Sequence, residues 1–197
     1  MERQCAISWR VIVSGPRGSG KTTACLRLIE RARQRGLNCA GLISPARFQA
    51  GRKVGIDVLD VRSGERRALA EADQLPGGLR TLAFRFDPSA VVWGADHLNT
   101  ACPCDVLVVD ELGPLELERG QGWVNALDVL RDGQFRLAVI VARPELVSIF
   151  QQTLPDASTP ILGPESLENQ WDALLARSGS HAARLRAAST TVAASGA

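Results

Sequence analysis

The sequence predicts an α/β fold, in which a mostly parallel sheet carries helices on both faces and an inserted β-hairpin. Short runs of continuous apolar residues, typical of strands buried on both faces, alternate with helical patterns along the chain. One segment breaks this alternation: around residues 54–58 apolar side chains recur at every second position, which indicates a hairpin. The 197 residues are 45% apolar and 22% charged, as in an ordinary globular domain.

Each element follows from a local pattern. Helices are predicted where apolar residues recur at helical spacing, as for Ala24, Leu28 and Ala32, with a glycine such as Gly36 as the stop. Asp87 is a suitable N-cap for the helix that begins at Pro88. In order, we expect a strand at 6–15, a helix at 21–36, a strand at 38–44, the hairpin at about 46–70, a strand at 81–86, a helix at 88–99, a strand at 105–113, a helix at 122–133, a strand at 135–145, a helix opened by Pro144, a strand at 159–163 and a helix at 164–178.

These elements predict one domain at 1–178, followed by a tail at 179–197. The tail is rich in Ala, Ser and Thr and has little to bury, so we expect it to be disordered. The net charge of +2 argues against a nucleic-acid partner, and no apolar stretch is long enough for a membrane span. The first residues lack the pattern of a signal peptide, so we expect a cytoplasmic protein. No protein partner can be inferred.

The residues G-P-R-G-S-G-K-T at 15–22 satisfy the phosphate-loop pattern G-x-x-x-x-G-K-[ST] between the first strand and the first helix. The glycines let backbone N–H groups converge on phosphate oxygens, and the helix N-terminus adds positive potential. Lys21 is one of only two lysines in a chain with 23 Lys and Arg residues. Its slim ammonium reaches the β- and γ-phosphates where the wide fork of arginine fits poorly.

Acidic residues at the end of a neighbouring buried strand complete the expected site. Asp110 follows four apolar residues, and with the Thr22 hydroxyl it is the predicted ligand of Mg²⁺. Glu111 is the candidate general base for the attacking water. Lys21 is the second residue expected to be catalytic. The residues expected to contact the nucleotide are Gly15, Pro16, Arg17, Gly18, Ser19, Gly20, Lys21, Thr22, Thr23, Asp110, Glu111 and Gly113.

Several other charged residues allow two interpretations. Arg47, Arg52 and Lys53 on the hairpin, and Arg143 after a buried strand, either stabilise the transferring phosphoryl group or are ordinary surface charge. Arg27, Arg31 and Arg35 share one helix face, which either binds phosphate or is simply solvated.

Other chemistry-bearing residues carry weaker hypotheses. Glu116 and Glu118 are expected to be solvated. Cys102 and Cys104 form a close pair but lack two further metal ligands nearby, so they are either a metal or redox pair or small residues before a strand. The four tryptophans are scattered, and none is identifiable as a stacking platform.

Four stretches taken together resemble the small nucleoside-triphosphatases first described from thermophiles, also called the cancer-related nucleoside-triphosphatase family. They are G-P-R-G-S-G-K-T-T (15–23), G-L-I-S (41–44) leading to G-R-K-V-G-I-D-V-L-D (51–60), V-L-V-V-D-E-L-G-P-L-E-L (106–117) and L-A-V-I-V-A-R-P-E (137–145). The resemblance implies a RecA-like P-loop domain that hydrolyses ATP, GTP and other nucleoside triphosphates slowly. This chain departs from the family pattern at Ala46, where the family usually has glutamate, and at Pro114, where it has lysine.

The leading hypothesis is therefore a Mg²⁺-dependent nucleoside triphosphatase that releases the terminal phosphate. A kinase for nucleosides or nucleotides, and a nucleotide-binding switch or accessory protein with negligible turnover, remain alternatives, because similar phosphate loops serve all three classes.

Overall fold

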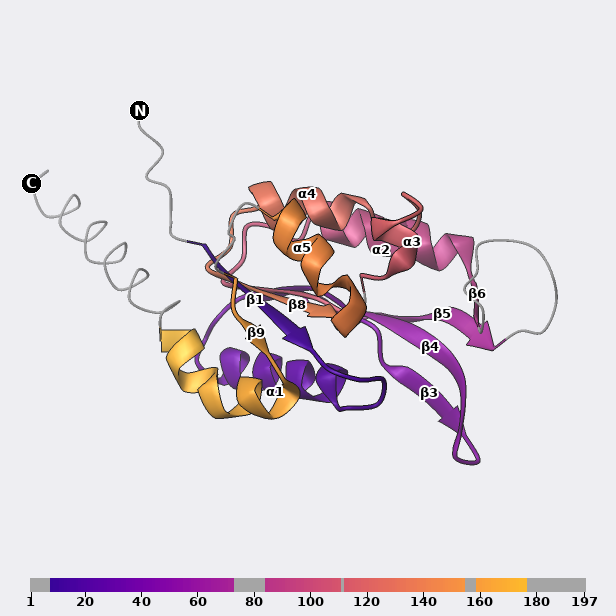
Figure 1. Ribbon diagram of the computed structural model, residues 1–197, viewed down its shortest axis with the longest axis horizontal. Helices are drawn as coiled ribbons and strands as arrows, with labels where there is room; N and C mark the ends of the chain where they lie inside the picture. Colours follow the sequence, from indigo (N-terminus) through magenta and orange to yellow (C-terminus); the bar gives the residue numbers. More distant parts are fainter. Residues whose placement is uncertain (1–7, 73–83, 111, 155–158, 177–197) are drawn as a thin grey trace, which may run out of the picture.

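The computed structural model describes residues 8–72, 84–110, 112–154 and 159–176, which form a sheet between two layers of helices (Figure 1). The strands are β1 (Trp9–Ser14), β2 (Cys39–Ile43), β3 (Ala46–Gln49), β4 (Arg52–Asp60), β5 (Arg66–Ala72), β6 (Phe84–Phe86), β7 (Val106–Val109), β8 (Leu137–Ala142) and β9 (Ile161–Leu162). The helices are α1 (Lys21–Gln34), α2 (Pro88–Asn99), α3 (Pro114–Leu117), α4 (Asn125–Asp132), the 3₁₀ helix η1 (Pro144–Leu146) and α5 (Val147–Thr153). A further helix covers residues 164–176.

Half of the sheet is parallel, in the order β2-β7-β8-β1-β9. Its central strands are continuous apolar runs because helices cover both of their faces. Along β1, Val11 and Val13 face one helical layer and Ile12 faces the other, as the twofold repeat of a strand requires. All three side chains are fully buried. The predicted parallel sheet with two covered faces is confirmed.

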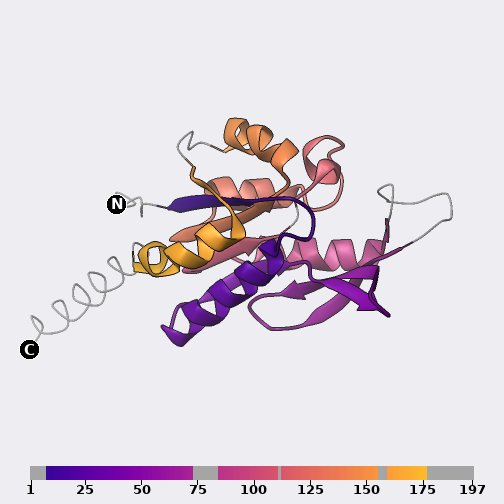
Figure 2. The same ribbon diagram turned by 60° about the horizontal axis from the view of Figure 1, so that its bottom comes forward.

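Different helices cover the two faces of the sheet. Helix α1 and the helix at 164–176 pack on one face, and α2, α4 and α5 pack on the other (Figures 1 and 2). The arginine face of α1 lies against the helix at 164–176, where Arg27 pairs with Glu168 at 2.8 Å and Arg31 pairs with Asp172 at 3.2 Å. Arg35 also contacts Asp172. The arginines on this face are exposed, as a solvated face requires, and they also pair with acids of the same chain, which does not support phosphate binding.

The other half of the sheet is antiparallel and larger than the predicted hairpin. Strand β4 pairs with β3, β5 and the end of β2, and β5 continues to β6. The segment at 46–72 thus has two turns, one at residues 50–51 and one between Asp60 and Arg66. The predicted hairpin is present as β4 and β5, and β3 extends it to a three-stranded meander. The alternating pattern is the same in a hairpin and a meander, and only turn chemistry separates them.

Most predicted helices are present, with small differences at their ends. The Asp87 carboxylate caps α2 by accepting from the N–H groups of Ser89 at 2.8 Å and Ala90 at 3.4 Å, as predicted. Pro144 opens a 3₁₀ turn before α5, and α3 was not expected at all. The predicted start of the strand at 81–86 and the tail at 179–197 lie outside the described residues. Among the helices described, none is long and apolar enough to cross a membrane.

Candidate functional site

The phosphate-loop sequence lies between β1 and α1, as predicted. Gly18 and Gly20 have φ angles of 80° and 89°, in the left-handed region that other residues rarely adopt. The Ser19 N–H donates to the Pro16 carbonyl at 3.2 Å, which closes the turn. Residues 16–20 are exposed, so the concave side of the loop is accessible to a ligand.

Lys21 is the first residue of α1, and its side chain folds back over the loop. The Nζ atom donates to the Gly15 carbonyl at 2.7 Å and to the Pro16 carbonyl at 2.8 Å. Thr22 follows within the first turn and is half-buried, whereas Thr23 is exposed. This geometry holds one ammonium group against the phosphate loop, at the N-terminus of α1, where an anion is attracted.

Asp110 follows β7 at the carboxyl edge of the sheet and is fully buried. Its Oδ2 atom accepts a hydrogen bond from the backbone N–H of Ser44 at 3.2 Å. Burial raises the pKa of Cys25 on α1, and the nearby charge of Asp110 raises it further. Asp110 therefore lies near Cys25, one turn along the helix that carries Lys21 and Thr22.

Strand β7 is not the immediate neighbour of β1, contrary to the sequence-based expectation. Strand β8 lies between them, pairing Val139 with Val11 on one side and with Val108 on the other. The apolar patterns of β7 and β8 are alike, so strand order could not be inferred from them. The consequence is that Arg143, directly after β8, emerges between the phosphate loop and Asp110.

Ser44 ends β2 at the same edge and was missed in the sequence. Its side chain is 5% exposed, and its Oγ atom has no hydrogen-bond partner within the part of the chain that the structure describes. A buried hydroxyl without a partner is costly in a folded protein. The available signal was a polar residue directly after a buried strand, which is also how Asp110 was found.

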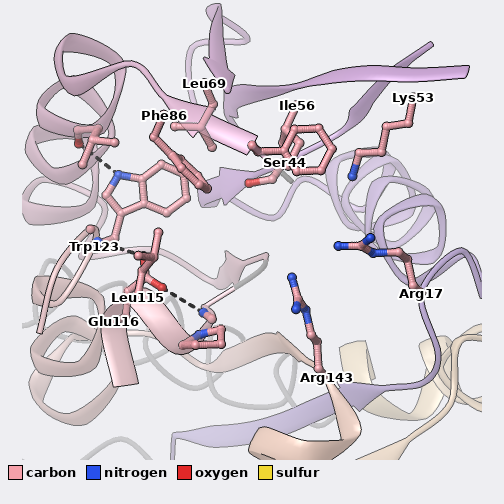
Figure 3. Close-up of a pocket in the computed structure, with 15 residues that line it drawn as sticks. Arg17, Ser44, Lys53, Ile56, Leu69, Phe86, Leu115, Glu116, Trp123 and Arg143 are labelled. Carbon is pink, nitrogen blue, oxygen red and sulfur yellow. Dashed lines mark hydrogen bonds between the residues drawn. The ribbon is translucent and has the colours of Figure 1, made fainter. Parts of the chain in front are cut away.

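A cavity opens beside these residues, between the phosphate loop and the antiparallel half of the sheet (Figure 3). Arg17, Lys53 and Arg143 point toward one another across its mouth. Its other end is apolar and includes the rings of Phe86 and Trp123. The apolar lining residues are Ile56, Leu69, Phe84, Phe86, Val91, Pro114, Leu115 and Trp123.

The cavity is continuous with the surroundings of Lys21. Arg143 and Gly113 line the cavity and also a smaller recess that includes Lys21 and Leu112. The side chains of Arg17 and Arg143 have no ion pair or hydrogen bond within the described residues. A negatively charged ligand above the loop therefore lies next to two arginines whose side chains pair with no carboxylate among the described residues.

Lys53 reaches the site, whereas the two hairpin arginines do not line the cavity. The Lys53 ammonium lies 5.0 Å from the centre of the Phe84 ring, a cation–π contact at the mouth. Arg47 pairs with Asp57 at 3.3 Å and Glu71 at 3.1 Å across the meander. Arg52 is exposed at the start of β4. Glu111, the candidate general base, lies outside the described residues.

Glu116 is a structural residue at the site, so the expectation that it is solvated was wrong. It is 8% exposed, and its two carboxylate oxygens accept from the N–H of Gly113 at 2.8 Å and of Trp123 at 3.1 Å. It thereby caps α3 and holds Trp123 against the cavity. Pattern analysis missed this because the acceptor role depends on two backbone groups brought together by tertiary structure. Glu118 is exposed, as expected.

The cysteine pair lies before β7, away from the residues that line the cavity. Cys104 is buried and Cys102 is half-buried, and the intervening peptide before Pro103 is cis. A hydrogen bond with Cys104 and the charge of Arg62 lower the pKa of Cys102, although burial opposes this. The described residues contain no group of three or more His, Cys, Asp or Glu side chains that could hold a metal ion.

Comparison with known proteins adds an independent observation. A model of the NTPase family matches residues 10–157. The nucleoside-triphosphatase THEP1 of Ignicoccus hospitalis is 31% identical over 148 residues, which cover 75% of this chain and 78% of that protein. The protein of the same name from Caldivirga maquilingensis is 30% identical over 131 residues, which cover 66% of this chain and 74% of that protein.

Two solved structures share the fold. The solution structure of a human cancer-related nucleoside triphosphatase has a TM-score of 0.64 at 22% identity and covers 86% of this chain and 96% of its own. The crystal structure of THEP1 from Aquifex aeolicus has a TM-score of 0.63 at 16% identity and covers 85% of this chain and 97% of its own. These similarities confirm the predicted fold class.

Proposed function

This chain belongs to the NTPase family and is a nucleoside-triphosphatase, and from that premise we propose that it hydrolyses the terminal phosphate of Mg²⁺-bound ATP, GTP and other nucleoside triphosphates. The observation that carries the proposal is the placement of Lys21 over the phosphate loop, at the edge of the sheet where Asp110 and Arg143 also emerge.

The phosphate loop binds the triphosphate. Backbone N–H groups of residues 15–20 and the N-terminus of α1 attract the phosphate oxygens. The Lys21 ammonium exchanges its contacts with the Gly15 and Pro16 carbonyls for oxygens of the β- and γ-phosphates. These carbonyl contacts keep the ammonium close to the position where it is needed.

The donor set fits Mg²⁺. The ion prefers oxygen ligands and usually binds through one or two protein groups together with substrate phosphates and water. The buried Asp110 carboxylate and the Thr22 hydroxyl provide such oxygens, and substrate phosphates and water would complete the site. When bound, the ion neutralises charge that develops between the β- and γ-phosphates.

We assign the proton transfer to Glu111, which follows the buried Asp110 in the sequence. Its carboxylate accepts a proton from the water that attacks the γ-phosphorus, while the bond from that phosphorus to the bridging oxygen breaks and the diphosphate leaves. Arg143, Arg17 and Lys53 stabilise the charge on the transferring group, since they converge on this side of the loop. We do not assign this role to Arg47 and Arg52, because they do not line the cavity.

Phosphate release by the purified protein tests the proposal. With Mg·ATP or Mg·GTP as the only substrate, inorganic phosphate should appear steadily and should stop when EDTA removes the metal. A requirement for an added nucleoside or nucleotide would instead indicate a kinase, and tight binding without release would indicate a switch. A cytoplasmic location is part of the same proposal, and microscopy of a tagged full-length chain tests it.

A further inference from the structure

The cavity beside the phosphate loop provides more than hydrolysis requires. Water is the second reactant of a triphosphatase, and water needs no apolar, aromatic space. We propose that this cavity binds a second small molecule, a flat aromatic ring that carries a phosphate group. The proposal rests on the proposed function only for the position of the nucleotide's terminal phosphate.

The apolar end of the cavity suits a ring. The indole of Trp123 is fixed, because its Nε1 atom donates to the Val91 carbonyl at 3.0 Å and its backbone N–H donates to Glu116. Trp123 and Phe86 present aromatic surface to the same space (Figure 3). Aromatic rings stack favourably on such surfaces.

The cavity is small as it stands, with a volume of about 50 Å³. A ring therefore enters only when long side chains at the mouth, such as those of Lys53 and Arg143, move aside.

The mouth of the cavity requires negative charge. Arg17, Lys53 and Arg143 converge there, in addition to Lys21 above the loop. Among the described residues that line the cavity, Glu116 is the only carboxylate, and it is bonded to backbone N–H groups. Many such enzymes stabilise the transferring phosphoryl group with a single arginine finger. Here the side chains of both Arg17 and Arg143 lack an acidic partner among the described residues, so a phosphate group on the second molecule binds to the same side chains.

Ser44 provides an independent indication of a ligand. Its hydroxyl lines the cavity between the cations and the aromatic end, is 95% buried, and has no hydrogen-bond partner among the residues described. Figure 3 shows its oxygen directed toward the open space. A polar atom of a bound molecule satisfies this hydroxyl, which removes the cost of leaving it unpaired.

Binding experiments without any nucleoside triphosphate test the proposal. Three probes are titrated into the full chain by calorimetry and by tryptophan fluorescence: phenyl phosphate for the shared chemistry, adenosine 5′-monophosphate for a nucleotide source, and pyridoxine 5′-phosphate for a non-nucleotide source. We expect at least one probe to bind and to quench the fluorescence. Adenosine without phosphate should bind more weakly than its monophosphate. The probe that binds most tightly shows whether the ligand of the cavity is a nucleotide or another aromatic phosphate.

Matched variants locate the bound probe. Trp123→Phe should remove most of the quenching, whereas Trp171→Phe, on the helix at 164–176, should retain it. Lys53→Met should weaken binding by about tenfold or more, the size expected for a lost charge-assisted contact. Its control is Arg52→Met, because successive side chains of β4 point to opposite faces and Arg52 does not line the cavity.

The Lys21→Ala variant separates this inference from the proposed function. It should lose nucleoside triphosphate and keep the aromatic phosphate. The inference fails if the wild-type protein turns over Mg·ATP and yet binds none of the three probes. It also fails if binding disappears in Lys21→Ala but is unchanged in Lys53→Met, since the probe then occupies the phosphate loop. Circular dichroism confirms that each variant is folded. If Trp123→Phe does not fold, the comparison of Lys53→Met with Arg52→Met decides whether the probe binds in the cavity.

Discussion

Lys21 shows at the scale of one residue why a chain rich in arginine has a lysine at this position. Its ammonium contacts two loop carbonyls at 2.7 and 2.8 Å, within a turn where a planar guanidinium fits poorly. We predict that Lys21→Ala abolishes binding of Mg·ATP and that Lys21→Arg does not restore it. Calorimetry on both variants, with circular dichroism as the control for folding, measures this. Wild-type affinity in Lys21→Arg would contradict the geometric argument.

Glu111 carries the second prediction at this scale. In Glu111→Gln the amide cannot accept the proton of the attacking water, so turnover should fall by about 10²-fold or more. Binding should be retained, because the phosphate loop and Asp110 are unchanged. Single-turnover phosphate release together with a nucleotide titration separates the two effects. An unchanged rate would remove Glu111 from the mechanism.

Sequence reasoning identified site residues only where a local pattern carries the chemistry. The phosphate loop and Asp110 could be found because spacing and strand ends are visible along the chain. Ser44 has the same strand-end signal as Asp110 and was missed. Trp123 and the buried role of Glu116 could not be found, since each depends on segments that only the fold brings together. The convergence of Lys53 and Arg143 is likewise a product of tertiary structure.

At the scale of elements, parallel strands were easier to predict than antiparallel ones. Continuous apolar runs marked β1, β2, β7, β8 and β9, because helices bury both faces of each strand. The meander of β3, β4 and β5 was taken for one hairpin, since alternation alone does not count turns. The order of β7 and β8 could not be predicted, because their compositions are nearly interchangeable.

Gly41 tests the packing of β2 against β7. Its φ angle is +108°, and an added Cβ atom would lie 1.9 Å from the carbonyl oxygen of Val108. We predict that Gly41→Ala lowers the free energy of unfolding by about 3 kcal/mol, because backbone must move and the conformation is strained. Gly163→Ala is the control, since a Cβ there meets nothing within 4 Å. Urea denaturation of both variants measures the difference, and equal midpoints would refute the argument.

At the scale of the whole molecule, the arginine face of α1 attaches the last described helix to the domain. Arg35, with Arg31, holds the pKa of Asp172 below its ordinary value of 3.8. A lowered folded-state pKa means that the stabilisation is present above the unfolded pKa and is lost as the pH falls through the folded one. Because the pairs are exposed, their contribution is modest and is screened by salt.

The corresponding prediction concerns the melting temperature of Asp172→Asn. At pH 7 and low salt the variant should melt below the wild-type protein, and the gap should close as the pH falls below 3.8 and through the lowered pKa of Asp172. High salt at pH 7 should narrow it as well. Scanning calorimetry at each condition measures the gap. A difference that does not shrink as the pH falls below 3.8 would mean that Asp172 acts through packing instead of charge.

The sheet consists of a parallel half and an antiparallel half, and the cavity lies where they meet. The phosphate loop, Asp110 and Arg143 belong to the parallel half, whereas Lys53, Leu69 and Phe86 belong to the antiparallel half. Mutations at Leu69 or Phe86 can therefore change which compound is selected without altering the phosphate loop, Asp110 or Arg143. Among relatives of this chain, the sequence of the antiparallel strands β3 to β6 should accordingly diverge faster than that of the parallel strands, because one hydrolytic site is adapted to different metabolites.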